Sequence, residues 1–249
     1  MKMITLAILL FAGFAATEAI AAPPPKECSS CHKALVSRKV VHPAITYGCP
    51  TCHTAVDATN VPHTKTNKVA FGLSGVQPGL CYGCHDTFTG KSVHPALALG
   101  CTTCHDPHSS PNRKLLVKTI PELCFTCHAQ ALFTRKHIHP PVAQGKCLKC
   151  HNPHAADSMT LLVKSPEELC LQCHPKVGKT PHVTADSFEG EHPIGLPKKG
   201  ENAVVKDPAR PDKPFYCGSC HNPHSADSAR LFRFKAQTAS DLCGYCHKK

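Results

Sequence analysis

The 249-residue sequence contains no tryptophan, and aromatic residues make up only 6% of it. With so few large side chains, the polypeptide is poorly supplied for building a sizeable hydrophobic core. Beyond residue 21, no stretch approaches the roughly 20 apolar residues that a membrane-spanning helix requires. Methionine is also scarce, since only Met1, Met3 and Met159 are present. These absences exclude a conventional large core and a membrane span.

Cysteine, in contrast, is abundant, and all 18 cysteines belong to nine copies of Cys-x-x-Cys-His, numbered here motif 1 to motif 9. Each copy is the attachment signature of a c-type haem, in which two thiols bond to the vinyl groups and the adjacent imidazole binds the iron. The sequence therefore predicts nine covalently bound haem c groups. The motifs are Cys28, Cys31 and His32; Cys49, Cys52 and His53; Cys81, Cys84 and His85; Cys101, Cys104 and His105; Cys124, Cys127 and His128; Cys147, Cys150 and His151; Cys170, Cys173 and His174; Cys217, Cys220 and His221; Cys243, Cys246 and His247.

Two other uses of cysteine compete with haem attachment. A disulfide framework has no reason to keep a spacing of two residues nine times, or to follow every pair with histidine. Zinc sites do use Cys-x-x-Cys pairs, but nothing in zinc coordination fixes a histidine directly after the second cysteine. Haem attachment accounts for both features.

The formal charge of +11 would ordinarily suggest nucleic acid or an anionic membrane as a partner. Nine haems would add about 18 propionate carboxylates and, when oxidised, about one positive charge at each ferric centre. The net charge is then roughly +2 for the oxidised protein and roughly −7 for the reduced protein. We therefore assign the excess of Lys and Arg to propionates and to an ordinary solvated face, and expect no nucleic-acid partner. At about 25 residues per haem, the haems themselves must form the core.

The first 21 residues have the parts of a secretory signal peptide: Lys2, an apolar run from Ile4 to Phe14, and small residues that end at Ala21. Since haem is attached covalently outside the cytoplasm, we expect an exported protein. The periplasm of a bacterium with two membranes is the leading location, and the outer membrane or the cell surface is the alternative.

The motifs form two-haem repeats. One unit contains Leu-Cys-x-x-Cys-His, then His-Pro, then a second Cys-x-x-Cys-His that usually continues x-Pro-His. Units lie at residues 28–63, 80–108, 123–154 and 169–224, and motif 9 at 243–247 stands alone. The first unit is looser, because His63 lies much further beyond its motif than in the later units. Residues 22–249 are therefore predicted to form one nine-haem domain.

The predicted fold is mostly coil with short α-helices and little or no sheet. Ser165-Pro166-Glu167-Glu168 predicts a capped helix that leads into Cys170, and Thr119-Ile120-Pro121-Glu122 predicts the same for Cys124. A proline two residues after several motif histidines ends the helix there. The longest insertion, between Gly195 and Pro214, is rich in Pro, Lys and Gly and predicts a surface loop.

Ten histidines lie outside the motifs, and nine irons need nine sixth ligands. His108, His154 and His224 follow a motif histidine by three residues, so they cannot reach the far face of that haem and must bind another one. Low reduction potentials are expected, because it is methionine ligation that raises them. For eight sixth ligands we expect His42, His63, His94, His108, His139, His154, His192 and His224; the ninth is His182 or His137, and the preceding proline favours His182.

This order of His-Pro, Cys-x-x-Cys-His-x-Pro-His and Leu-Cys-x-x-Cys-His resembles the doubled-motif multihaem cytochromes c. The resemblance covers residues 28–247 and implies a periplasmic or outer-membrane electron carrier of metal- or nitrite-respiring bacteria. In that family the haems lie in closely stacked and perpendicular pairs, and some members sit inside a porin. The displaced His63 departs from the pattern.

The main hypothesis is an electron carrier without a catalytic residue, in which a row of low-potential haems connects redox partners. Those partners would be other cytochromes, quinol-linked donors, or an outer-membrane cytochrome or porin. A reductase for nitrite, hydroxylamine or a sulfur oxyanion is the alternative, and it would need one open iron. A subunit of a haem-lined filament is the third hypothesis, and it would imply an oligomer.

Overall fold

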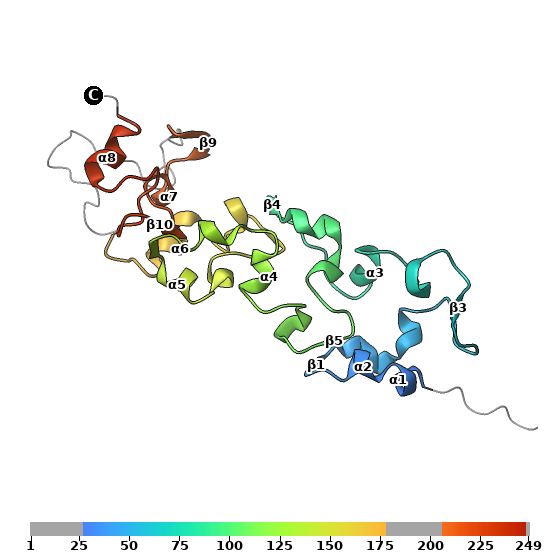
Figure 1. The fold of residues 1–249 in the computed structure, drawn as a ribbon. Coiled ribbons are helices and arrows are strands. Elements are labelled where there is room, and N and C mark those ends of the chain that lie inside the picture. Colours follow the sequence, from blue (N-terminus) through green and yellow to red (C-terminus); the bar gives the residue numbers. More distant parts are fainter. Residues whose placement is uncertain (1–26, 178–205, 248–249) are drawn as a thin grey trace, which may run out of the picture.

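The computed structural model describes residues 27–177 and 206–247. The chain forms an elongated body that runs from α1 and β3 at one end to α8 at the other, so units adjacent in sequence are also neighbours in space (Figure 1). The predicted signal peptide, His182 and His192 lie outside the described residues.

The helices of the described residues are all short, as predicted. The α-helices are α1 (Cys28–Cys31), α2 (Lys33–Val36), α3 (Gly79–Tyr82), α4 (Glu122–Phe125), α5 (Pro140–Ala143), α6 (Pro166–Leu171), α7 (Cys217–Cys220) and α8 (Ala239–Gly244). The 3-10 helices are η1 (Pro43–Tyr47), η2 (Cys49–Thr51), η3 (Ala70–Gly72), η4 (Pro95–Leu99), η5 (Cys101–Thr103), η6 (Arg113–Leu115), η7 (Gln130–Leu132), η8 (Cys147–Lys149) and η9 (Met159–Leu161).

The strands are equally short and pair two by two, all antiparallel. They are β1 (Val40–Val41), β2 (Val56–Asp57), β3 (Thr64–Lys65), β4 (Ser92–Val93), β5 (Ser109–Ser110), β6 (His137–Ile138), β7 (Ala155–Ala156), β8 (Lys206–Asp207), β9 (Arg210–Pro214) and β10 (Ser225–Ala226). The described residues form no larger sheet, which confirms the predicted class of short helices, coil and minimal sheet.

Only one of the two predicted helix starts is confirmed. At α6, Ser165 caps the helix by accepting a hydrogen bond from the Glu168 N–H, and Pro166 is the first helical residue. The prediction for Thr119 is wrong in detail, because α4 begins only at Glu122. The Thr119 hydroxyl donates to the Glu122 carboxylate rather than accepting a bond from the helix backbone.

Three of the strand pairs join segments that are far apart in sequence, and we call them crossings. Crossing 1 pairs β1 with β5, crossing 2 pairs β4 with β7, and crossing 3 pairs β6 with β10. In each, a His-Pro segment lies beside an x-Pro-His segment of a later unit. The backbone N–H of the His-Pro histidine donates to the backbone carbonyl of the other histidine: His42 to His108 at 2.8 Å, His94 to His154 at 2.8 Å, and His139 to His224 at 3.0 Å.

The predicted surface loop before Pro214 is wrong in its described part. Residues 206–214 form a hairpin of β8 and β9, and the Asp207 side chain is only 1% exposed. A buried carboxylate needs a charged or hydrogen-bonding partner, and the Arg210 guanidinium supplies it through Nε at 2.8 Å and Nη2 at 2.5 Å. This ion pair explains why a polar, proline-containing segment is ordered here.

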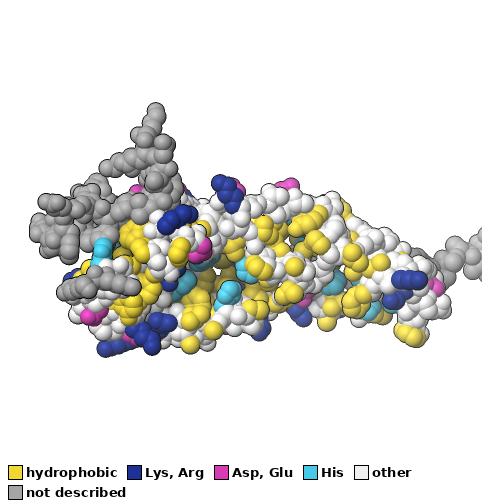
Figure 2. Space-filling view, turned by 90° about the horizontal axis from the view of Figure 1, so that it is seen from above, with side chains coloured by type: hydrophobic (Ala, Val, Ile, Leu, Met, Phe, Trp, Pro, Cys, Tyr) yellow, Lys and Arg dark blue, Asp and Glu magenta, His cyan; other side chains and the backbone are white. Residues whose placement is uncertain are grey.

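The polypeptide has little core of its own. Among the described residues, the buried apolar side chains are Ala155, Phe215, Ala226, Phe232 and Ala236. Most of the other apolar side chains, such as Leu99 and Tyr47, are partly or largely exposed in the polypeptide. The surface is hollowed along its length, and histidine side chains lie among apolar ones in these hollows (Figure 2). This arrangement fits a protein whose core is supplied by bound prosthetic groups.

Crossing 2 leaves no room for a side chain at Gly90, which gives a first testable prediction. A Cβ there would lie 2.8 Å from the Ala156 carbonyl oxygen and 2.9 Å from its carbonyl carbon. Because both atoms are backbone, Gly90→Ala must push the strands apart, and we expect the free energy of unfolding to fall by about 1–3 kcal/mol. The measurement is denaturant unfolding of the holoprotein.

Gly75→Ala is the matched control, because a Cβ at Gly75 meets nothing within 4 Å. If the two variants unfold at the same denaturant concentration, the close approach at crossing 2 does not contribute to stability.

Candidate haem sites

Each Cys-x-x-Cys-His motif forms one turn of helix. In all nine, the histidine N–H donates to the carbonyl of the first cysteine, with N···O distances of 2.9 to 3.0 Å. Residues at positions 1, 4 and 5 of a helical turn lie on the same side, so both thiols and the imidazole of a motif face one way. None of the 18 cysteines is bonded to another as a disulfide. Each motif thus presents the three groups that covalent haem attachment uses.

Among the described residues, seven motif histidines face a histidine from elsewhere in the chain, which we call the distal histidine. The ring centroids of the seven pairs lie 5.9 to 6.2 Å apart. The pairs are His32 with His63, His42 with His85, His53 with His108, His94 with His128, His105 with His154, His139 with His174, and His151 with His224.

This spacing fits two imidazoles on opposite faces of one iron. A metal–imidazole nitrogen bond is about 2 Å long and the nitrogen lies about 1.1 Å from the ring centre, so two such rings have centroids about 6 Å apart. Direct packing of two rings would allow a closer approach, as Phe88 and His154 show at 4.0 Å. The donor set of two imidazoles and two thiols therefore fits a c-type haem.

The protein environment favours the neutral form of six of the seven distal histidines. Burial is the largest cause that lowers the pKa of each of six: His42, His94, His108, His139, His154 and His224. The effect is greatest at His224, whose pKa falls to about 4 through burial and the nearby His151, His139 and His128. A neutral imidazole has a lone pair available for iron at pH 7.

The even-numbered motif histidines have a second anchor. The Nδ1 atoms of His53, His105, His151 and His221 each lie 2.8 to 3.0 Å from a backbone carbonyl, of Phe71, Lys114, Thr160 and Arg230 respectively. An Nδ1–H that donates to this carbonyl leaves Nε2 free for the metal and fixes the plane of the ring. The same kind of outer hydrogen bond supports metal-binding histidines in general.

The carbonyls are presented by tight turns with positive φ. Lys114 has φ 57° and Thr160 has φ 52°, although neither is glycine. Sequence reasoning missed these turns. Their signal is the repeated Leu-Leu-Val-Lys at 115–118 and 161–164, whose valine N–H donates back to the second cysteine carbonyl of the preceding motif.

The cysteines of successive motifs lie close together along the whole row. Burial and the neighbouring Cys101 thiol raise the pKa of Cys81 to about 11, and burial and Cys147 do the same for Cys124. Burial and then Cys28 raise the pKa of Cys49, while contact with Cys217 is the largest cause that raises the pKa of Cys170. These four contacts link motifs 1 and 2, 3 and 4, 5 and 6, and 7 and 8.

For the other pairs of successive motifs, one cysteine of each motif lies close enough to interact electrostatically with one of the next. These interactions join Cys52 with Cys81, Cys104 with Cys127, Cys150 with Cys173, and Cys220 with Cys246. Every motif therefore lies beside the next one, from motif 1 to motif 9.

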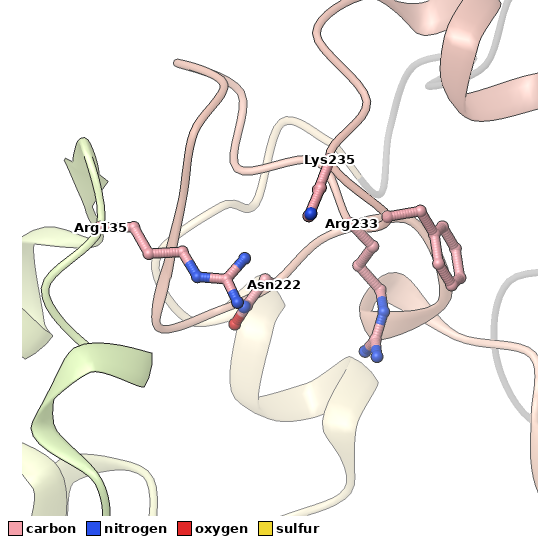
Figure 3. A pocket seen from close by; sticks show the side chains of 5 residues that line it. Arg135, Asn222, Arg233 and Lys235 are labelled. Carbon is pink, nitrogen blue, oxygen red and sulfur yellow. The ribbon is translucent and has the colours of Figure 1, made fainter.

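Motif 8 is held by two guanidinium groups. The Gly218 carbonyl, inside the motif, accepts bonds from Arg210 Nη2 at 2.9 Å and from Arg233 Nη1 at 3.0 Å. Figure 3 shows the Arg233 side chain turned toward α7, which carries this carbonyl. The β8–β9 hairpin thereby fixes the motif through Asp207 and Arg210.

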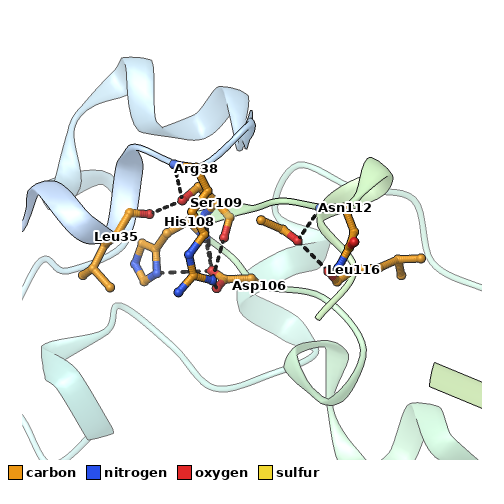
Figure 4. Close-up of polar contacts among 8 residues, drawn as sticks. Leu35, Arg38, Asp106, His108, Ser109, Asn112 and Leu116 are labelled. Atoms are coloured by element: carbon orange, nitrogen blue, oxygen red, sulfur yellow. Dashed lines mark hydrogen bonds and ion pairs between the residues drawn. The ribbon is translucent and has the colours of Figure 1, made fainter. Parts of the chain in front are cut away.

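Crossing 1 is stabilised by a polar network around the distal histidine His108 (Figure 4). Asp106 accepts from the His108 backbone N–H at 2.9 Å and pairs with Arg38 Nη1 at 3.1 Å. The buried Ser109 hydroxyl donates to the Leu35 carbonyl at 2.6 Å. Asn152 and Asn222 take the place of Asp106 at the later crossings and accept the same backbone bond, from His154 and His224.

Phe88 packs on a distal histidine, and its removal gives a second prediction. Its ring lies 4.0 Å from that of His154 with an interplanar angle of 10°. Such contacts contribute about 0.5–1.5 kcal/mol. We expect Phe88→Ala to lower stability by about 1 kcal/mol and, because the His154 ring loses its support, to shift the g values of one low-spin haem in the EPR spectrum.

The matched control is Phe88→Val, since Val36 occupies the aligned position at crossing 1. It should retain the low-spin spectrum more fully than the alanine variant does. An unchanged spectrum and stability in Phe88→Ala would contradict a positioning role for this ring.

Five of the 19 histidines lie outside these seven pairs. Among the described residues, His137 is the distal candidate whose ring faces no motif histidine; its backbone pairs with Ala226 in crossing 3. His182 and His192, the other two predicted ligands, lie outside the described residues. The other two are the motif histidines His221 and His247.

Comparisons with known proteins identify the chain. The family model for the doubled CXXCH motif matches residues 94–132, 139–179 and 207–249. The family model for cytochrome c7 and related cytochrome c matches residues 35–106. No curated protein matches the chain significantly.

In residues 27–177 and 206–247, no helix is long and apolar enough to cross a membrane. Helical Cys-x-x-Cys-His turns, facing imidazoles and both family matches agree with one another. The chain belongs to the multihaem c-type cytochromes of the doubled-motif and c7 type, a family of electron carriers.

Proposed function

We propose that this cytochrome binds nine haems, one at each motif, and carries electrons along them between redox partners. Each iron would be held by its motif histidine and one distal histidine, so that no iron is open to substrate. The observation that supports this most strongly is the set of seven histidine pairs with centroids about 6 Å apart.

The pairs follow a simple rule, which we take as the ligand assignment. An odd-numbered haem from 3 to 7 takes the His-Pro histidine that follows the motif two places earlier: His42, His94 and His139 for haems 3, 5 and 7. An even-numbered haem from 2 to 6 takes the x-Pro-His histidine that follows the motif two places later: His108, His154 and His224 for haems 2, 4 and 6. Haem 1 takes the displaced His63.

The rule for odd-numbered haems extends to haem 9, and haem 8 takes the candidate that remains. His192 is followed by proline and comes after motif 7, so it is assigned to haem 9. His182 then serves haem 8, and His137 binds no iron.

The row would be continuous because two kinds of link alternate along it. Contacts between first cysteines connect haem 1 with 2, 3 with 4, 5 with 6, and 7 with 8. At each crossing, a backbone hydrogen bond joins the distal histidines of two successive haems. The three crossings would thereby connect haem 2 with 3, 4 with 5, and 6 with 7. Cys220 and Cys246 add the step from haem 8 to haem 9.

Low reduction potentials follow from two imidazole ligands at each iron. We propose that the chain is exported by its first 21 residues to the periplasm and exchanges electrons there with other cytochromes, a quinol-linked donor or an outer-membrane conduit. N-terminal sequencing of the purified protein should find Ala22 as the first residue.

Binding of carbon monoxide to the reduced protein distinguishes an electron carrier from a reductase. The fully reduced protein should show no change in its Soret band under carbon monoxide, because a six-coordinate iron with two imidazoles offers no binding position. A change that corresponds to about one haem in nine, together with oxidation of the reduced protein by nitrite, would favour a reductase.

A further inference from the structure

The three crossings differ in charge at one pair of positions. Four residues before the His-Pro histidine stand Arg38, Gly90 and Arg135; two residues before the facing histidine stand Asp106, Asn152 and Asn222. Crossing 1 therefore has an ion pair, between Arg38 and Asp106 at 3.1 Å. Crossing 2 has neither charge. Crossing 3 has an arginine, Arg135, but the amide of Asn222 takes the place of the aspartate carboxylate.

A cavity of about 230 Å³ lies at this point of crossing 3. Arg135, Asn222, Arg233, Phe234 and Lys235 line it, and none of these is acidic. In Figure 3, the Arg135 and Lys235 side chains come from two different segments and converge on Asn222. Arg233 turns away and is engaged with the Gly218 carbonyl. Two cations thus face a cavity to which the lining residues contribute no negative charge.

The groups that converge here are all hydrogen-bond donors suited to an anion with several oxygens. A guanidinium offers two parallel N–H bonds, an ammonium offers a compact charge, and the amide of Asn222 adds a neutral donor. Carboxylates match this set, as Asp106 shows for the equivalent arginine at crossing 1.

We propose that Arg135 and Lys235, together with Asn222, bind a carboxylate or a small oxyanion at crossing 3. Asn222 directly follows the motif histidine of haem 8 and lies two residues before His224, the proposed ligand of haem 6. The anion has two sources: a propionate of haem 6 or haem 8, which rests on the proposed function, or a free oxyanion from solution.

The test is a spectroelectrochemical titration of the full-length holoprotein that carries Arg135→Gln and Lys235→Gln together. The titration is run in chloride and in sulfate at equal ionic strength. Loss of the two cations should move one or two haems to more negative potentials. Lys136→Gln is the matched control, because Lys136 is the exposed neighbour of Arg135 and does not line the cavity.

If the anion is a propionate, the shift appears equally in both salts. If it is a free oxyanion, the wild-type curve differs between sulfate and chloride and the double variant loses that difference. Curves of variant and wild type that superimpose in both salts would overturn the proposal. Haem content and the EPR spectrum of the same samples report separately on the proposed function, because nine low-spin haems can persist whichever result is obtained.

Discussion

Replacement of His108 by alanine should convert about one haem in nine from low spin to high spin, because the iron of haem 2 loses one of its two imidazoles. The His108 ring faces that of His53 at 6.1 Å and 10°, nearly parallel. The bond from His42 is made to the His108 backbone carbonyl, so alanine retains the strand pair of crossing 1. The measurement is low-temperature EPR of the oxidised variant, with carbon monoxide binding to the reduced variant as a second readout.

His137→Ala is the control for this experiment. His137 lies in β6, next to a distal histidine in sequence, but faces no motif histidine in the described chain. Its variant should retain the wild-type spectrum and bind no carbon monoxide. A high-spin signal in His137→Ala, or its absence in His108→Ala, would show that the ligand assignment is wrong.

Removal of the haem in the middle of the row should have the second large effect. In the variant Cys124→Ala with Cys127→Ala, motif 5 loses both attachment thiols, and the haem content should fall by about one-ninth. The links from haem 4 to 5 and from haem 5 to 6 both pass through this motif. We therefore expect conductance between the two ends of single molecules to drop sharply.

The matched control removes the last haem instead, through Cys243→Ala with Cys246→Ala. It loses the same amount of haem but leaves motifs 1 to 8 continuous. The two variants should therefore agree in haem content and differ in conductance. Equal conductance would mean that electrons do not pass through haem 5.

Much of this site could be predicted from sequence, because haem attachment uses a fixed local pattern. The short spacing from Cys28 to His32, repeated nine times, defines a helical turn without any tertiary information. The argument that His154 cannot reach the haem beside it also needed only chain geometry. The structure adds which ring it faces, that of His105.

Other features depend on contacts between distant segments and had no local signal. Strands of two residues, such as β1 and β5, are too short for any hydrophobic alternation, and their register is fixed by pairing across the chain. The turn at Lys114 places a non-glycine residue at positive φ, which composition does not predict. The hairpin at 206–214 looked like a loop because its order comes from one buried ion pair, between Asp207 and Arg210.

The Thr119 segment shows a similar limit. Its composition matches a capping box, yet the helix begins at Glu122, since the threonine hydroxyl bonds to the glutamate side chain instead. Ser165 has the same chemistry and does cap its helix. Sequence identified the residues of both sites, but only the backbone geometry decided which of them forms the cap.

The central claim is a row of nine haems, each with two histidine ligands, and EPR of the oxidised wild-type protein tests it most directly when haem is quantified in the same sample. The account predicts nine haems per chain and low-spin signals that account for all of them. Fewer than nine haems, or a high-spin signal that shifts when nitrite is added, would contradict it.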